Sequence, residues 1–230
     1  MKILKFPFSA PLQSWGEDAR WDTRSTSVCP TKSGIIGFLG CCLGIPRGDE
    51  RLNCMNQELR IAVRTDRPGQ ILTDFQTVQG TDGKFLNAEG KPRTGGGTII
   101  TPKQYLLNAW FTVFLQGDEK LLNQCCSAML HPRWTPYLGR KNCVPAIPVV
   151  PEWVEAGTLE EAVRLFSEED LKHCERNVTV EMDLTADSEV SPEERIHTRN
   201  DSVIHAEKNE YDSRLVKTCT IRCGGETSCS

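Results

Sequence analysis

Several features that mark enzymes and membrane proteins are missing from this sequence. No run approaches the ~20 apolar residues that a membrane-spanning helix needs, and the N-terminus has neither the apolar core nor the cleavage site of a signal peptide. The four histidines lack metal-ligand spacing, and the HExxH and GxSxG motifs do not occur. We therefore expect a cytoplasmic protein without a metal or cofactor, and nothing here demands an enzyme.

Paired cysteine motifs are also missing, although cysteine itself is abundant. None of the eleven cysteines is spaced as CxxC, and two pairs are adjacent, Cys41–Cys42 and Cys125–Cys126. The odd number argues against a complete disulfide framework. We expect most of these residues to be buried thiols that pack as small apolar groups.

The net charge of −4 hides a strong asymmetry along the chain. Residues 1–150 carry 18 Lys and Arg against 12 Asp and Glu, whereas residues 151–230 carry 9 against 19. This distribution suggests that the first part faces a polyanion and that the second faces solvent or a basic partner. An acidic, solvated region without a role explains the second part equally well.

The hydrophobic pattern predicts an alternation of strands and helices. The order is strand, helix, strand, long excursion, strand, helix, strand, which is the βαββαβ order of the α+β ferredoxin-like fold. The strands are expected at Lys2–Ser9, Glu58–Asp66, Tyr105–Leu115 and Val178–Leu184, and the helices at Ser33–Leu43, at Asp118–Leu130 and, more briefly, from Thr158.

The long polar excursion spans about Asp66–Thr101. It is rich in glycine, with GGG at Gly95–Gly97, and a segment of this length inside a domain is more often functional than a plain connection. Its cations, among them Arg93 and Lys103, suit a loop that grips phosphates. A loop that is simply disordered would have a similar composition.

The stretch PTKSGIIGFLGCCLGI, residues 30–45, combines a helical pattern with several glycines. Gly34, Gly37, Cys41 and Gly44 share one face of the predicted helix. Each glycine inside a helix costs about 0.5–1 kcal/mol relative to alanine, so we expect a compensating reason for this face, such as the close approach of another backbone.

The start of this helix resembles a nucleotide-binding loop only in part. In that motif the glycines precede the lysine, whereas TKSG places its glycine after Lys32. The order argues against an ATPase. An isolated phosphate could still bind the free amides at the helix start, beside Thr31, Lys32 and Ser33.

A second candidate site is the basic turn HPRWTPYLGRKNC, His131–Cys143. No acidic residue occurs from Ser127 to Pro151, and the turn interleaves cationic with aromatic side chains. Such a mixture suits single-stranded nucleic acid, whose bases stack on rings while cations follow the phosphates. A tight turn in which Trp134 and Tyr137 fill the core, with solvated cations, remains an open alternative.

Five motifs together resemble the CasD subunits of type I-E Cascade, the RNA-guided bacterial CRISPR surveillance complex, within the RAMP superfamily. The resemblance extends over about residues 1–145 and weakens beyond Pro151. Its motifs are APLQSWG (Ala10–Gly16), the glycine-bearing stretch 30–45, DFQTV (Asp74–Val78), YLLNAWFTV, and the basic turn.

This resemblance implies a ferredoxin-like (RRM-like) βαββαβ domain in residues 1–150. A β-hairpin thumb is expected as an insertion at about 66–104. Residues 151–230 are expected to form a small β-rich extension, with a helix and strands that complete or extend the domain.

The resemblance also implies a function, that of a non-catalytic RNA-binding subunit. Such a subunit holds the 5′ handle of the CRISPR RNA, contacts the adjacent backbone subunit and the large PAM-reading subunit, and meets target DNA indirectly through the guide duplex. The residues expected to bind RNA are Lys32, Ser33, Arg93, Lys103, Arg133, Tyr137, Arg140 and Lys141.

The alternative function is that of a metal-independent endoribonuclease that processes precursor CRISPR RNA. His131 could act there as general base on a ribose hydroxyl, or Tyr137 could take part, near Arg140 and Lys141. No convergent acid–base pair is visible in the sequence, and a structural role for His131 is the simpler interpretation.

Overall fold

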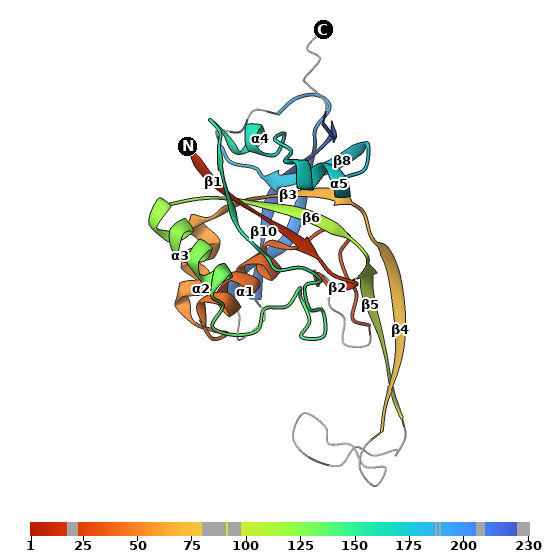
Figure 1. Cartoon of the computed structure of the whole chain (residues 1–230). Coiled ribbons are helices and arrows are strands. Elements are labelled where there is room, and N and C mark those ends of the chain that lie inside the picture. The colour runs from red at the N-terminus through yellow and green to blue at the C-terminus, as the bar shows by residue number, and fades with distance from the viewer. Residues whose placement is uncertain are drawn as a thin grey trace.

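A seven-stranded antiparallel sheet forms the centre of the molecule, and a long hairpin projects from one end of it (Figure 1). This computed structural model describes residues 1–17, 23–79, 91, 98–186, 188, 190–205 and 210–224. The strands are, in spatial order, β7 (Glu152–Glu155), β1 (Lys2–Ser9), β6 (Trp110–Gln116), β3 (Arg60–Arg67), β8 (Asn177–Asp183), β10 (Glu210–Arg222) and β9 (Arg195–His205).

Helices cover both faces of this sheet because alternate residues of the central strands are apolar on each side. On one face, Phe6 and Val113 pack in a large cluster beneath the helices α1, α2 and α3. On the other face, Phe114 and Val180 pack in a smaller cluster beneath α4 and α5. The helices are α1 (Lys32–Leu43), α2 (Glu50–Glu58), α3 (Glu119–Leu130), α4 (Leu159–Ala162) and α5 (Glu168–His173).

The second face of β3 differs from the half-buried strand that the sequence predicts. Arg64 has no exposed surface, because α4, α5 and the segment between them cover it. Its guanidinium pairs with Asp66 at 2.5 Å and lies 4.0 Å from the centre of the Phe166 ring. An arginine in an alternating pattern predicts a surface position, and the ion pair and ring contact explain why this one is inside.

The projecting hairpin consists of β4 (Gln70–Val78) and β5 (Ile99–Leu107), and the short strand β2 (Leu12–Gln13) pairs with its base. Nine residues in each strand give a length of about 30 Å. The predicted single strand Tyr105–Leu115 was wrong, because Asn108 adopts a left-handed conformation with φ 53° and separates β5 from β6.

The two long helices begin and end where the sequence predicts, within a residue or two. The Thr31 side chain caps α1 by accepting a hydrogen bond from the Gly34 N–H, and Gly44 ends the helix with φ 70°. Asp118 caps α3 in the same way through the N–H groups of Lys120 and Leu121. Helix α2, which the sequence did not predict, covers the same face of the sheet.

The cysteines follow the prediction only in part. Cys42 and Cys125 are buried, and burial raises the pKa of each thiol to about 12. In contrast, Cys174 at the end of α5 and Cys223 beyond β10 form a disulfide. This bond joins the short helices on the second face to the last described residues of the chain.

Candidate nucleic-acid interface

A cleft of about 790 Å³ lies along the glycine-bearing face of α1. Gly34, Gly37 and Cys41 contribute its helical side, as their shared face predicts. Trp15 and the basic turn contribute a second part of the lining, and Tyr211 of β10 contributes a third. Four segments of the chain thus meet around one opening.

The glycines of α1 serve different purposes along this face. A Cβ at Gly34 would lie 2.8 Å from the Trp15 ring, so this glycine lets the tryptophan pack on the helix. At Gly37 a Cβ would meet nothing within 4 Å, so the backbone there is bare. Gly44 lies under the Arg133 side chain. Only Gly37 therefore leaves room for another molecule.

The basic turn is held against the loop after β2 by backbone contacts. The Ser14 N–H donates to the Leu138 carbonyl at 3.2 Å, and the Leu138 N–H donates to the Cys143 carbonyl at 2.8 Å. Gly139 has φ 88°, and a Cβ there would lie 1.6 Å from the Ser14 carbonyl oxygen. These constraints fix the turn beside the cleft.

Three of the residues that the sequence predicts as RNA contacts line this cleft, namely Ser33, Tyr137 and Lys141. Lys141 is exposed and Tyr137 is partly exposed. Trp134 and Arg47 join them, although neither was among the predicted contacts. A ring, a cation and a hydroxyl therefore share one opening, as a single-stranded nucleic acid requires.

Arg140 takes a different position from the one expected of an RNA contact. Its guanidinium donates to the Gln104 carbonyl at 3.0 Å and to the Arg24 carbonyl at 2.9 Å. It also lies 4.8 Å from the centre of the Tyr105 ring. Arg140 thus ties the basic turn to β5 at the base of the hairpin.

Lys32 is turned into the protein, which corrects its predicted role. The residue is 8% exposed, and its ammonium donates to the Leu59 carbonyl at 2.9 Å and to Asp183 at 3.0 Å. Because it is paired inside the protein, Lys32 does not line the cleft. Its spacing next to Ser33 could not distinguish an inward from an outward side chain.

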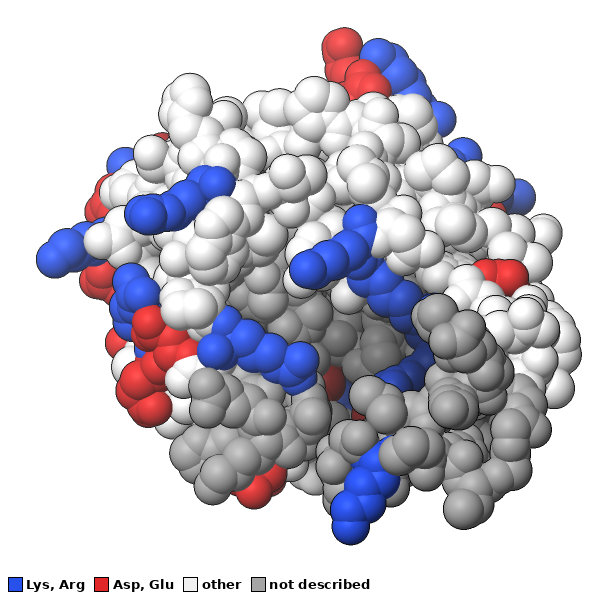
Figure 2. All heavy atoms as spheres, turned by 90° about the horizontal axis from the view of Figure 1, so that it is seen from below, with Lys and Arg blue, Asp and Glu red and all other residues white. Residues whose placement is uncertain are grey.

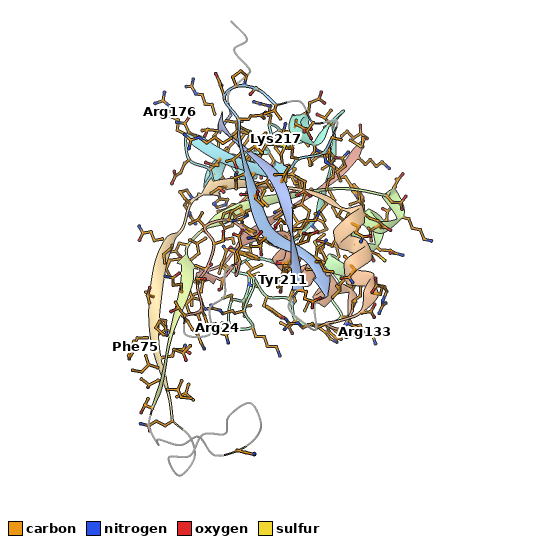
Figure 3. The ribbon with its side chains drawn as sticks, turned by 180° about the vertical axis from the view of Figure 1, so that it is seen from behind. Arg24, Phe75, Arg133, Arg176, Tyr211 and Lys217 are labelled. Carbon is orange, nitrogen blue, oxygen red and sulfur yellow. A yellow bond between two sulfur atoms is a disulfide. The ribbon has the colours of Figure 1, made fainter. Side chains whose placement is uncertain are left out.

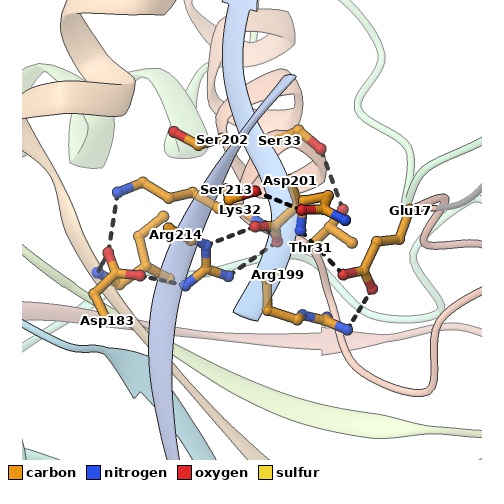
Figure 4. A network of polar contacts seen from close by, with 12 residues as sticks. Glu17, Thr31, Lys32, Ser33, Asp183, Arg199, Asp201, Ser202, Ser213 and Arg214 are labelled. Atoms are coloured by element: carbon orange, nitrogen blue, oxygen red, sulfur yellow. Dashed lines mark hydrogen bonds and ion pairs between the residues drawn. The ribbon is translucent and has the colours of Figure 1, made fainter. Parts of the chain in front are cut away.

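The N-terminus of α1 is occupied by a carboxylate from the C-terminal hairpin. The Lys32 N–H donates to Asp201 of β9 at 2.7 Å, and Arg214 donates two hydrogen bonds to the same carboxylate (Figure 4). Burial raises the pKa of Asp201, but the hydrogen bonds and charge of Arg214 outweigh it and hold this pKa below its ordinary value. The predicted phosphate site at the helix start was therefore wrong, since a carboxylate fills it.

The remaining predicted residues lie elsewhere. Arg133 and His131 line a separate groove of about 1180 Å³ between α2 and α3. Lys103 lies on β5 of the hairpin, directly across from Asp74. Arg93 lies outside the described residues. The structure thus distributes the predicted set over the cleft, the α2–α3 groove, the hairpin and the interior.

Cationic side chains lie on the face from which the hairpin projects. Figure 2 shows Lys and Arg side chains bordering a hollow on this face.

Among the described residues, no group of three or more His, Cys, Asp and Glu side chains is arranged to hold a metal ion. In the same part of the chain, no helix is long and apolar enough to cross a membrane.

Solved structures with the same architecture define the class of this protein. One chain of a "CRISPR RNA-guided surveillance complex" aligns over 96% of this chain and 90% of its own length, with 28% identity and a TM-score of 0.68. A "Crystal structure of Cas protein" aligns over 96% and 95%, with 24% identity and a TM-score of 0.64, which shows the fold alone. The class is that of mixed α/β CRISPR-associated proteins with antiparallel sheets.

The sequence places the chain more narrowly within this class. Residues 3–215 match the family model described as "CRISPR-associated protein (Cas_Cas5)", and the chain belongs to that family. The "CRISPR system Cascade subunit CasD" of Escherichia coli (strain K12) is 35% identical over 147 residues. That alignment covers 59% of this chain and 63% of the relative, less than two thirds of its length. The predicted resemblance is confirmed.

Proposed function

We propose that this chain is a non-catalytic subunit of an RNA-guided CRISPR surveillance complex and that its cleft holds the 5′ handle of the CRISPR RNA. The observation that carries the proposal is the cleft itself, where Tyr137 and Lys141 line the opening beside the bare backbone of Gly37. A ring for stacking, a cation for phosphate and an uncovered peptide surface suit a single strand whose bases are splayed apart.

The strand order supports a ferredoxin-like domain as the scaffold of this site. Along the sheet, β7 lies beside β1, then β6, then β3. With α1 between β1 and β3 and α3 between β6 and β7, these elements follow the βαββαβ order. The fourth strand is then β7, and not the strand predicted at Val178–Leu184, which is β8 and lies on the other side of β3. The hairpin β4–β5 then corresponds to the inserted thumb.

We assign the contact with the adjacent backbone subunit to this hairpin. Ile71, Phe75 and Ile100 project from the same face of its two strands, and each is more than half exposed. Figure 3 shows Phe75 on the projecting ribbon. An apolar strip on a projecting ribbon is suited to a protein partner. The large PAM-reading subunit contacts another part of the chain, and target DNA is met through its pairing with the guide.

The placement of the two candidate cleavage residues favours a non-catalytic role over the endoribonuclease. Tyr137 lines the cleft, whereas His131 lines the groove between α2 and α3. A general base must reach the hydroxyl whose proton it takes, within about 3 Å or through one water. Because Tyr137 lines the cleft and His131 lines the α2–α3 groove, the two side chains cannot act on the same hydroxyl.

The test is to measure binding of the purified chain to a single-stranded RNA with the handle sequence across a salt series. Lys141→Ala should weaken binding and make the slope of log K against log salt shallower by about 0.7, the value for one phosphate contact on a single strand. Lys120→Ala is the matched control, because Lys120 is an exposed lysine that lines the other groove.

Equal effects of the two substitutions would contradict the cleft as the RNA site. Cleavage of precursor RNA at a defined position, without added metal, would replace the proposal with the endoribonuclease.

A further inference from the structure

The C-terminal hairpin formed by β9 and β10 supplies part of the cleft that lies outside the region of strongest sequence resemblance. Tyr211 of β10 and Val203 of β9 line the cleft, and they are direct cross-strand partners. The other described residues of the lining come from the first 150 residues. Tyr211 is 42% exposed, so its ring offers open aromatic surface at this place (Figure 3).

Two bulges in β9 flank this pair. The register shifts between Glu210 and Tyr211, and again between Asp212 and Arg214, and each time β9 contains one extra residue. A bulge bends its strand, increases the local twist and redirects side chains. Strand β9 of this hairpin packs against α1 and α2, and Tyr211 lies across from Val203, between the two bulges.

Buried polar contacts fix the body of the hairpin to the elements that form the rest of the cleft. Asp201 joins Arg214 to the first N–H of α1, and Arg199 pairs with Glu17 at 2.5 Å (Figure 4). Asn56 of α2 donates to the Ser202 side chain at 2.8 Å. The hairpin is therefore anchored within a few residues of Tyr211.

Aromatic side chains thus approach the cleft from two independent segments. Trp134 and Tyr137 come from the basic turn, and Tyr211 comes from the hairpin. A base is uncharged and has an aromatic face, so it is the part of a nucleotide that suits this ring.

We propose that Tyr211 stacks on one base of the RNA strand in the cleft, and that Asp201 with Arg214 positions the hairpin that presents it. This inference rests on the proposed function and adds a binding residue to it. Lys141 then contacts a phosphate of the RNA, and Tyr211 contacts a base.

The experiment measures affinity of the full chain for a single-stranded handle RNA that contains 2-aminopurine. Tyr211→Ala should weaken binding about five- to 100-fold, the range for loss of one stacked base. Tyr211→Phe should bind within about twofold of the unsubstituted chain, because the ring remains. Leu215→Ala, at a position on the same strand that is exposed but outside the cleft lining, should leave affinity unchanged.

The positioning role has its own readout. Asp201→Asn should weaken RNA binding and reduce the change in 2-aminopurine fluorescence, whereas adding it to Tyr211→Ala should have little further effect, as expected for residues acting through one contact. If Asp201→Asn fails to fold, the comparison of Tyr211→Ala with Tyr211→Phe still decides the stacking, because Tyr211 lies at the surface.

The outcomes separate this inference from the proposed function. If Lys141→Ala weakens binding and Tyr211→Ala binds like the unsubstituted chain, the stacking role is overturned and the RNA cleft stands. If the unsubstituted chain does not bind the RNA, both proposals fail.

Discussion

At the scale of single residues, the cations of this chain divide into those that hold the protein together and those left at its surface. Arg64 and Lys32 are buried in ion pairs, and Arg140 donates to two backbone carbonyls. Lys141, next to Arg140 in the sequence, is exposed at the cleft. Neighbouring cations therefore have unrelated roles, and a count of basic residues overstates the surface available to RNA.

Lys32 and Lys141 provide a direct comparison of these roles. We expect Lys32→Met to lower the free energy of unfolding by about 3 kcal/mol, because it leaves the buried Asp183 with one counter-charge fewer. Lys141→Ala should change stability by less than about 0.5 kcal/mol. Urea unfolding of both variants checks this. Arg214 also pairs with Asp183, so a stable Lys32→Met would show that Arg214 alone compensates this carboxylate.

At the scale of elements, glycines shape both the helix and the turn that border the cleft, but under different constraints. Gly139 has a left-handed backbone and lies against the Ser14 carbonyl, so no side chain fits. Gly37 lies in ordinary helix with open space above it. The fold itself requires glycine at position 139. At position 37 a side chain would fit the fold, and a glycine is needed there only if the cleft binds the proposed RNA.

Substitutions at these glycines should therefore have opposite effects. Gly139→Ala should cost about 2–4 kcal/mol, from the left-handed backbone and the overlap with Ser14. Gly37→Ala should stabilise the chain by about 0.5–1 kcal/mol. Gly37→Leu should fold but bind RNA more weakly, since its side chain enters the cleft. Urea unfolding combined with RNA titration checks all three, and unchanged RNA affinity in Gly37→Leu would argue against the cleft.

Most of the elements could be predicted from the sequence, because their signals are local. Caps and periodicity located α1 and α3, and alternation located β1 and β8. The cleft was predictable on the sides made by α1 and the basic turn. The positions of Asp201 at the start of α1 and of Tyr211 in the cleft could not be predicted. Both depend on where β9 and β10 pack in the fold, and the local sequence does not indicate this.

At the scale of the whole molecule, some of the acidic residues in the second part of the chain pair with buried cations of the first part. Asp170 of α5 pairs with Lys5 and Arg64, and Asp183 of β8 pairs with Lys32. The acidic second part of the chain thus provides counter-charges for the basic first part. Neither of the two interpretations of the acidic part, as solvated surface or as the site of a basic partner, anticipated this role.

Residues 1–150 should consequently fail to fold without the rest of the chain. Their buried cations would lose the partners supplied by Asp170 and Asp183, and one apolar face of β1 and β6 would be uncovered. Circular dichroism and hydrogen exchange of the fragment check this, with the full chain expected to unfold in one transition. A fragment with its own cooperative transition would instead establish residues 1–150 as an independent domain.

The exposed apolar strip of the hairpin, formed by Ile71, Phe75 and Ile100, can favour self-association of the free chain at high concentration. Two copies that meet through Ile71, Phe75 and Ile100 hide from water the same surface that a partner would cover. Self-association of this kind grows with concentration, whereas the partnered chain is protected from it. If the hairpin has the partner proposed above, matched synthesis of the two chains would limit this self-association, so the ratio of the subunits would bear on how much of this chain stays monomeric.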